Sequence, residues 1–240
     1  MKYAVDLHIH SALSPCADKD MTPNNIVNMA ILKGLDAIAV TDHNTSGNLG
    51  ALGRCAQKSG LILIPAIEVE TAEEIHIVCL FPDIQAANEF DNIVKQALPD
   101  IKNRPDIFGR QLIMDENDNI IGEEHRMLLA ASGLTIDDVI MLVRKLNGAP
   151  IPAHIDRPSY SILSNLGILP QELDIKYLEI SRDCDGLLFR STRPELDRYH
   201  LIKSSDAHHL GDILERTNFL ELDVLNAEEI IKKLSAKRLR

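Results

Sequence analysis

Two histidines stand close to the amino end of the chain, in the sequence DLHIHS at residues 6–11. His8 and His10 follow a short apolar run, and side chains at positions i and i+2 of a strand point to the same face. The sequence therefore predicts two imidazoles that project together from the end of a first strand. More histidines and acids stand beside other apolar runs, namely Asp42 and His43, Glu68, His76, His154, and Asp206 with His208.

Imidazole and carboxylate groups are ligands for Zn²⁺, Mn²⁺ or Fe²⁺, and a carboxylate can bridge two ions. One histidine at a strand end is more often an ordinary polar residue, so the argument rests on the joint placement of the set. Six histidines and at least two acids exceed what one tetrahedral ion can use. We therefore expect two or three divalent ions, Zn, Mn or Fe, with Glu68 as the bridge. Three other histidines are expected outside this ligand set: His125, His200 and His209.

Short apolar runs alternate with amphipathic stretches along most of the chain. Strands are predicted at 3–9, 35–41, 61–67, 75–81, 150–155, 176–181 and 200–205. Helices are predicted at 23–33, 46–59, 84–97, 135–147 and 226–238. A strand followed by a helix, repeated about seven times, is typical of a parallel α/β architecture.

A barrel is favoured over an open sheet because no G-x-G-x-x-G sequence follows the first strand. The carboxyl ends of barrel strands share one mouth, so polar residues from distant parts of the chain would meet there. The length of 240 residues suits one such domain, which we expect to span residues 1–240.

The region at about 99–132 interrupts this alternation. It contains two apolar runs around a polar turn at residues 115–119, which predicts a hairpin followed by a short helix. Such an insertion between barrel units is either a lid or specificity element, or a surface ornament.

Composition narrows the class of protein. The net charge of −11 argues against a basic surface that coats nucleic-acid phosphates, so no stable duplex binding is expected. No apolar run reaches the roughly 18 residues that a bilayer span needs, and no secretory leader is apparent, which favours a cytoplasmic protein without membrane contact. The four cysteines form no C-x-x-C pair, so neither a disulfide framework nor a zinc knuckle is predicted.

The order of these motifs resembles the PHP family, named for polymerase and histidinol phosphatase. DLHIHS, then TDHN, Glu68 with His76, AHIDR and finally SDAH extend over most of the chain, from residue 4 to about 210. The resemblance implies a distorted seven-stranded (β/α)7 TIM-like barrel with a trinuclear metal centre and phosphoesterase chemistry.

The resemblance also implies a ligand for each ion. His8 and His10 would bind one ion with Glu68 and Asp206, and Glu68 would bridge to a second ion held by His76 and His154. The third ion would use His43, His208 and one residue shortly after the first motif. Family members often carry that ligand at the position of Pro15, whereas the acids here arrive later. Alignment from the following Met-Thr-Pro favours Asp18, with Asp20 and Cys16 as alternatives.

The expected reaction is hydrolysis of a phosphate ester by a hydroxide bound to the metal cluster, with Glu68 bridging and Asp206 as a further ligand. Arg157 and Arg182 would clamp the substrate phosphate, or else form salt bridges with nearby carboxylates. Asp42 is expected to orient His43 or another ligand, and Asp6 to do the same for the first motif.

Three functions remain open at this point. The first is a phosphatase for a small phosphomonoester or nucleotide, and the second is a 5′-3′ nuclease that trims short oligonucleotides. The third is a regulatory metal-binding module without turnover, which would predict gaps in the ligand set. Aromatic residues make up only 4% of the sequence, so stacking platforms for nucleic-acid bases are sparse.

Overall fold

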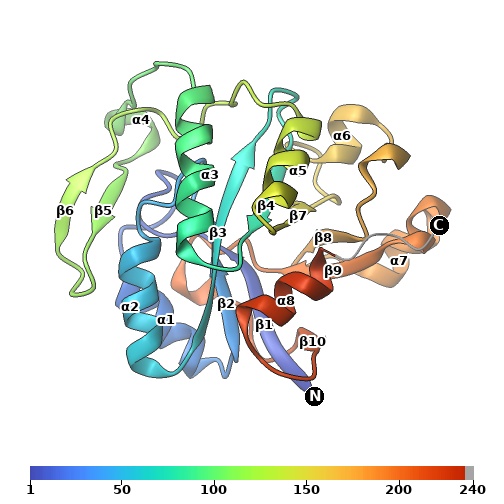
Figure 1. Cartoon of the computed structure of the whole chain (residues 1–240), viewed down its shortest axis with the longest axis horizontal. Helices are drawn as coiled ribbons and strands as arrows, with labels where there is room; N and C mark the ends of the chain where they lie inside the picture. The colour runs from blue at the N-terminus through green and yellow to red at the C-terminus, as the bar shows by residue number, and fades with distance from the viewer. Residues whose placement is uncertain (236–240) are drawn as a thin grey trace.

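The structure is a computed structural model, and it describes residues 1–235 (Figure 1). Its strands are β1 Lys2–Ile9, β2 Ala37–Val40, β3 Ile62–Glu70, β4 His76–Leu80, β5 Leu112–Met114, β6 Ile120–Glu123, β7 Ala149–Pro152, β8 Tyr177–Ser181, β9 His200–Ser204 and β10 Phe219–Glu221. Its α-helices are α1 Pro23–Leu32, α2 Leu49–Ser59, α3 Ile84–Ala97, α4 Pro105–Phe108, α5 Ile136–Lys145, α6 Ile162–Leu166, α7 Gly186–Ser191 and α8 Ala227–Leu234.

A curled, mixed sheet organises this α/β fold. Six strands pair in the order β10-β1-β2-β3-β4-β7, and β8 and β9 form a separate parallel pair. The pair contacts the larger sheet at two places. The N–H of Ile155, just after β7, donates to the Glu179 carbonyl at 2.9 Å, and Ile9, at the end of β1, forms a bridge with Ala207.

The expectation of an entirely parallel sheet is wrong at β4. This strand runs antiparallel to both β3 and β7, and β10 runs antiparallel to β1. Only residues 71–75 separate β3 from β4, and a parallel crossover needs about a dozen or more residues. The reversal has a consequence for the site, because the first residue of β4 now lies beside the last residue of β3.

All seven predicted strands are present, and the helices at 23–33, 46–59, 84–97 and 135–147 correspond to α1, α2, α3 and α5. The predicted helix at 226–238 corresponds to α8, and its positions 236–238 lie outside the described residues. The short elements α6, α7 and β10 were not predicted from the sequence.

Two apolar clusters cover the two faces of the sheet. Alternate strand residues such as Ile64, Ala66, Val78 and Leu80 form one cluster with the apolar side of α8. The opposite face packs against α1, α2, α3 and α5. Glu68 continues the alternation of Ile64 and Ala66, so β3 directs it to the first of these faces.

A β-bulge in β1 explains how its histidines reach the same face. Val5 and Leu7 belong to the cluster with α8, so regular alternation would turn His8 the other way. The pairing with β2 shifts between Asp6 and Ile9, where three steps along β1 match two along β2. One extra residue at a bulge reverses the alternation that follows it.

The insertion contains the predicted hairpin, formed by β5 and β6. The expectation of a short helix after the hairpin is wrong, since the short helix α4 precedes it. The insertion packs against the loop after β1, where the Leu112 N–H donates to the Ala12 carbonyl at 3.0 Å. Gly109 allows this approach, because a Cβ there would lie 2.3 Å from the carbonyl oxygen of Pro15.

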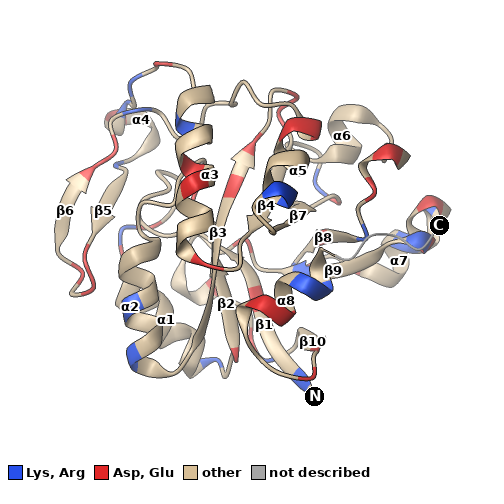
Figure 2. Cartoon of the chain, in the orientation of Figure 1, with Lys and Arg blue, Asp and Glu red and all other residues tan. Residues whose placement is uncertain are grey.

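Acidic and basic residues are both spread over the helices and loops (Figure 2). Within the described part of the chain, no helix is long and apolar enough to cross a membrane.

Candidate metal centre

Glu68 lies at the centre of a ring of imidazoles. Five histidines bring a ring nitrogen within 3.4 Å of its carboxylate: His76 Nδ1 at 2.9 Å, His43 Nδ1 at 3.0 Å, His8 Nε2 at 3.2 Å, His10 Nε2 at 3.3 Å and His154 Nε2 at 3.4 Å. The chain therefore gathers residues from β1, β3, β4 and the segments after β2 and β7 around one carboxylate.

Asp206 forms a second carboxylate position beside the first. Its Oδ1 lies 3.0 Å from Nε2 of His10, 3.2 Å from Nε2 of His8 and 3.7 Å from Nδ1 of His208. His8 and His10 thus stand between the two carboxylates, with their own Nε2 atoms 3.2 Å apart.

Backbone geometry places the ligands that follow β7 and β9. His154 and Asp206 have positive φ angles of 29° and 50°, a conformation that non-glycine residues seldom adopt. Such strain costs about 1–3 kcal/mol per residue and persists at functional sites, where the surrounding structure enforces it. At these two positions it turns the side chains toward Glu68 and the histidines of β1.

The donor set fits divalent cations. Within residues 1–235, both carboxylate oxygens of Glu68, Oδ1 of Asp206 and Nδ1 of His154 are buried without a hydrogen-bond partner. Buried polar atoms normally find partners, and leaving a carboxylate oxygen unpaired is costly. Three groups of side chains hold their donor atoms within 4.8 Å of one another: His10, His43 and His208; His8, His10 and Glu68; and His43, Glu68 and His76.

The histidines of the centre differ in the direction in which their surroundings shift the pKa. Burial lowers the pKa of His76, but the carboxylates of Glu68 and Glu70 outweigh it and raise this pKa to about 9. Burial and the nearby His10 instead lower the pKa of His208 to about 4. Burial alone would raise the pKa of Glu68, yet the surrounding imidazoles hold it well below its usual range.

Glu179, on β8, orients the first ligand, and sequence reasoning did not identify it as a site residue. Its two carboxylate oxygens lie 2.9 and 3.1 Å from Nδ1 of His8, and Oε1 also accepts the backbone N–H of His154 at 3.1 Å. The only sequence signal is an acid inside the apolar run at 176–181.

Asp42 acts on the centre through serines. It accepts hydrogen bonds from Ser11 and Ser14, and the Ser14 hydroxyl lies 2.9 Å from Nδ1 of His10. Asp6, expected to orient the first motif, instead accepts the backbone N–H groups of Ser205 and Leu214 at 3.0 and 2.9 Å. Asp6 therefore holds the segment that leads into Asp206.

The structure separates the two arginines. Arg157 hydrogen-bonds to the carboxylate of Asp206, and 40% of its side chain is exposed at the edge of the centre. Arg182 hydrogen-bonds to the side chain of Asp212 at 3.0 Å and to its carbonyl at 3.1 Å. The structure thus brings Arg157 to the centre and directs Arg182 to a salt bridge.

Asp18 does not join the buried cluster in this structure. Its Oδ2 lies 3.6 Å from Nδ1 of His209, and its backbone N–H donates to the carbonyl of His208. Cys16 and Asp20 are exposed in the same loop. Among the described residues, His125, His200 and His209 belong to none of the three groups above.

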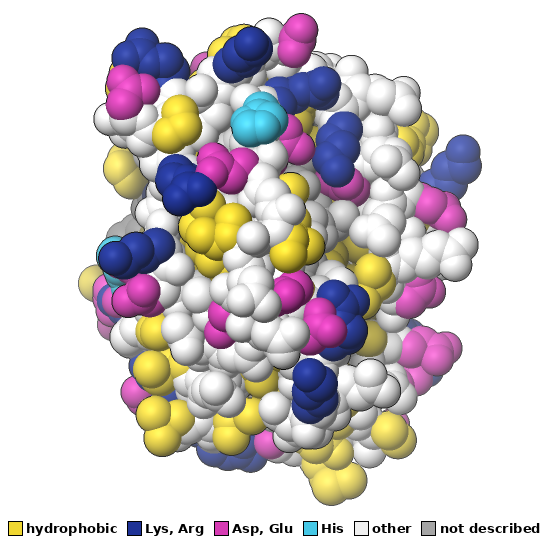
Figure 3. All heavy atoms as spheres, turned by 90° about the vertical axis from the view of Figure 1, so that its left-hand side faces the viewer, with side chains coloured by type: hydrophobic (Ala, Val, Ile, Leu, Met, Phe, Trp, Pro, Cys, Tyr) yellow, Lys and Arg dark blue, Asp and Glu magenta, His cyan; other side chains and the backbone are white. Residues whose placement is uncertain are grey.

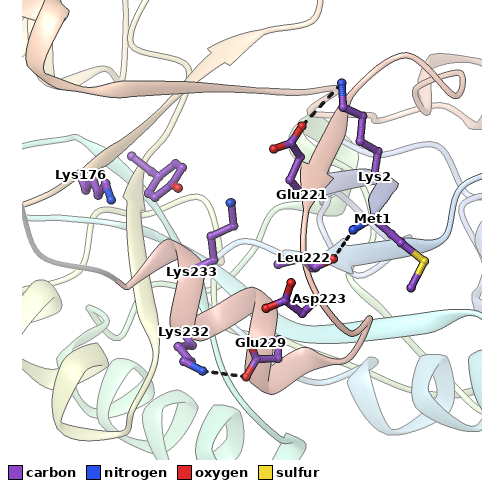
Figure 4. A pocket seen from close by; sticks show the side chains of 10 residues that line it. Met1, Lys2, Lys176, Glu221, Leu222, Asp223, Glu229, Lys232 and Lys233 are labelled. Carbon is purple, nitrogen blue, oxygen red and sulfur yellow. Dashed lines mark hydrogen bonds and ion pairs between the residues drawn. The ribbon is translucent and has the colours of Figure 1, made fainter.

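A separate cavity lies far from the centre, at the start of β1 (Figure 4). Its lining includes Lys2, Glu221, Glu229 and Lys232, which pair as Lys2 with Glu221 at 3.6 Å and Lys232 with Glu229 at 3.0 Å. None of the imidazoles around Glu68 lines this cavity.

Residues 6–212 match the family model of the PHP domain. The chain belongs to the PHP domain family. The match runs from the strand that carries His8 and His10 to just beyond Asp206 and His208, so it encloses every residue of the buried cluster.

Two curated relatives are enzymes that act on phosphate esters. The chain is 39% identical over 89 residues to the 5′-3′ exoribonuclease Rnm of Salmonella typhimurium, covering 34% of this chain and 29% of Rnm. It is 30% identical over 79 residues to the 3′,5′-nucleoside bisphosphate phosphatase of Chromobacterium violaceum, covering 32% of this chain and 27% of the phosphatase. The chain thus matches less than a third of the length of either relative.

Solved structures of other proteins have a similar fold. The lesion-specific endonuclease PfuEndoQ of Pyrococcus furiosus superposes with a TM-score of 0.70 at 21% identity, over 98% of this chain and 56% of that chain. An endonuclease Q complex holds a 27-mer duplex substrate with an abasic lesion. This neighbour conflicts in part with the expectation, drawn from the net charge, of no stable duplex binding, although the likeness at this identity concerns the fold alone.

Proposed function

We propose that this chain is a metal-dependent phosphoester hydrolase that acts on a small phosphomonoester or a nucleotide. The observation that carries the proposal is the buried carboxylate of Glu68, which lacks hydrogen-bond partners and is surrounded by imidazoles from four separate parts of a PHP domain. Divalent ions bind to such oxygen and nitrogen atoms and would supply the partners that these atoms lack.

The proposed ligand assignment is the one that the family resemblance implies. His8, His10, Glu68 and Asp206 would hold one ion, Glu68 would also serve a second ion with His76 and His154, and His43 with His208 would hold a third. We propose two or three ions of Zn, Mn or Fe. Bound divalent ions supply positive charge for phosphoryl oxygens and lower the pKa of water toward neutrality.

The chain's own residues bind and orient the substrate. Although burial raises the pKa of Asp206, His8 and His10 hold it well below its usual range, so its carboxylate stays charged and keeps Arg157 at the edge of the centre. A partly exposed guanidinium there can donate two parallel hydrogen bonds to a phosphate. Glu179 and Ser14 meanwhile keep the rings of His8 and His10 in fixed orientations.

We also infer that seven strands, β1 to β4 and β7 to β9, form a distorted barrel whose mouth is this centre, within a single domain. The hydrogen bond from Ile155 to Glu179 and the bridge between Ile9 and Ala207 support this arrangement.

A nuclease is the second candidate, and the identity to Rnm favours it. The face that carries the insertion shows acidic and basic side chains intermixed, without a continuous basic stripe (Figure 3). A short single-stranded end therefore suits this chain better than a long duplex. A module without turnover is disfavoured, because the side chains of the six expected histidines, Glu68 and Asp206 converge, and Asp18 alone of the expected ligands lies outside the cluster.

The test is to purify the protein with its metal, count ions by elemental analysis, and assay phosphate release with and without a chelator. The panel contains nucleoside bisphosphates, histidinol phosphate and a short 5′-phosphorylated oligonucleotide. Two or three ions and chelator-sensitive release are expected, with both reduced in Glu68→Gln. A protein that binds ions but hydrolyses no substrate after Mn²⁺ addition would favour the module without turnover.

A further inference from the structure

The described residues include all nine phenylalanines and tyrosines of the chain, and only two of these are exposed. One lies at the metal centre and the other lies away from it. Tyr160 is 46% exposed and Phe219 is 42% exposed. Phe219 begins β10 and pairs with Ala4, near the start of β1 and away from the histidines at its other end. Tyr160 lies directly against the metal centre.

The ring of Tyr160 stacks on the ring of His76. The centroids are 4.8 Å apart and the planes are inclined by 24°. The Tyr160 carbonyl also accepts the backbone N–H of His76 at 2.9 Å, so backbone and side chain are both fixed against the start of β4. One face of the ring covers the imidazole, while 46% of the residue remains exposed.

The backbone at Tyr160 is strained. Its φ angle is +54°, which is a marked outlier for a bulky residue and costs about 1–3 kcal/mol. A glycine or asparagine would adopt this conformation more easily. The chain nevertheless places an aromatic ring there. Because the ring is only partly buried, it contributes only part of the stabilisation that full burial of its apolar surface would give.

The same loop carries the phosphate-binding candidate. Arg157 stands three residues before Tyr160, and the hydroxyl of Ser161 donates to the Arg157 carbonyl at 2.8 Å, which closes the turn between them. The segment 154–161 therefore presents an imidazole for metal, a guanidinium beside Asp206 and an aromatic face in sequence. The guanidinium would bind the phosphate at the metal centre, and the aromatic face lies close enough along the chain to meet the base of the same nucleotide.

We propose that Tyr160 is the platform on which the nucleobase of the substrate stacks, so that the substrate is a nucleotide or a single-stranded nucleic-acid end rather than a phosphorylated sugar or amino alcohol. This inference rests on the phosphoester hydrolysis proposed above. Stacking on an aromatic side chain accepts any base, because every base has a π face. The proposal therefore assigns a substrate class and no sequence preference.

A purely structural role for Tyr160 predicts different behaviour. If the ring served only to shield His76, its loss would disturb the metal centre and reduce hydrolysis of all substrates alike. If the ring binds the base, its loss affects KM for substrates that carry a base and leaves base-free substrates unchanged.

The experiment compares the metal-loaded wild type with Tyr160→Leu, Tyr160→Phe and Phe219→Leu. Each protein is assayed on a nucleoside 3′,5′-bisphosphate and on the matching ribose bisphosphate without a base. Each is also assayed on a short 5′-phosphorylated oligonucleotide and on the same oligonucleotide with an abasic first residue. The free nucleoside is added as a competitive inhibitor, and metal content is measured in every variant.

We expect Tyr160→Leu to raise KM for the base-carrying substrates by about 5- to 150-fold and to weaken inhibition by the nucleoside similarly. Its KM for the base-free substrates and its metal content stay unchanged, Tyr160→Phe stays close to wild type, and Phe219→Leu changes nothing. The base-carrying substrate with the larger increase in KM shows whether Tyr160 binds the base of a free nucleotide or that of an oligonucleotide end.

Equal losses on base-carrying and base-free substrates, or a loss of bound metal in Tyr160→Leu, would overturn the stacking role in favour of shielding. Unchanged KM for every substrate would overturn it as well. If the metal-loaded wild type hydrolyses no phosphoester at all, the proposed function itself fails, which is a different result from hydrolysis without base discrimination.

Discussion

Glu179 contacts Nδ1 of His8 with both of its carboxylate oxygens, at 2.9 and 3.1 Å. An acceptor at Nδ1 keeps a ring proton there, which leaves Nε2, the nitrogen that faces Glu68 and Asp206, as the one that would bind an ion. Because Glu179 also accepts the N–H of His154, one buried carboxylate fixes two proposed ligands.

Replacement of Glu179 by glutamine should weaken metal binding. The amide keeps the size of the side chain but loses the charge that raises the basicity of His8, and loss of such outer contacts lowers metal affinity about 10- to 100-fold. Titration of metal into chelator-stripped protein measures the effect, with the exposed Glu172→Gln as control. Equal affinity in Glu179→Gln and wild type would contradict this role.

Arg157 and Arg182 form a matched pair for testing phosphate binding. Arg157→Ala should lower kcat/KM about 10- to 150-fold, because a charge-assisted contact to phosphate is lost. Arg182→Ala should leave kcat/KM unchanged, since Arg182 is engaged with Asp212. Steady-state kinetics on one phosphomonoester measures kcat/KM of both variants. Their metal content is measured too, because loss of Arg157 could disturb its partner Asp206, a proposed metal ligand. An equal decrease in the two variants would refute the assignment.

The position of Asp18 predicts a small effect on the third ion. Its carboxylate faces His209 in the structure, whereas His208 belongs to a group of three imidazoles with His10 and His43. Asp18→Asn should therefore keep the wild-type number of ions, and His208→Asn should lose one. Elemental analysis after gel filtration counts them. Loss of an ion in Asp18→Asn would show instead that the loop rearranges to deliver this ligand.

The positions of the strands along the chain and the convergence of the histidines could be predicted because both depend on local patterns. Apolar runs define the strands, and parallel strands bring their carboxyl ends together. His43, Glu68 and Asp206 meet in space although 163 positions separate His43 from Asp206.

Other features could not be predicted from the apolar runs alone. The reversal of β4 is what brings His76 beside Glu68, and it followed from the length of residues 71–75 rather than from the apolar run. Glu179 could not be identified from the sequence, since its partner His8 lies 171 positions away. The orientation of Asp18 is set by its loop, through the hydrogen bond to the His208 carbonyl.

The raised pKa of His76 predicts how the metal-free protein responds to pH. A histidine whose pKa is about 9 when folded and 6.5 when unfolded stabilises the fold fully below pH 6.5 and loses that contribution as the pH rises through 9. The free energy of unfolding should therefore fall across this window, by at most about 1.4 kcal/mol per pH unit for this one proton.

Bound metal should reverse this trend, because ions compete with protons for the same imidazole and bind better as the pH rises. Urea unfolding at pH 6 to 9, with chelator and with saturating Mn²⁺, measures both slopes. His76→Asn should flatten the slope of the metal-free protein. The other histidines of the centre whose pKa is raised, His8, His10 and His43, should keep part of it. If the metal-free slope is the same in wild type and His76→Asn, the positive charge that balances Glu68 lies on another imidazole of the cluster, and the prediction for His76 is wrong.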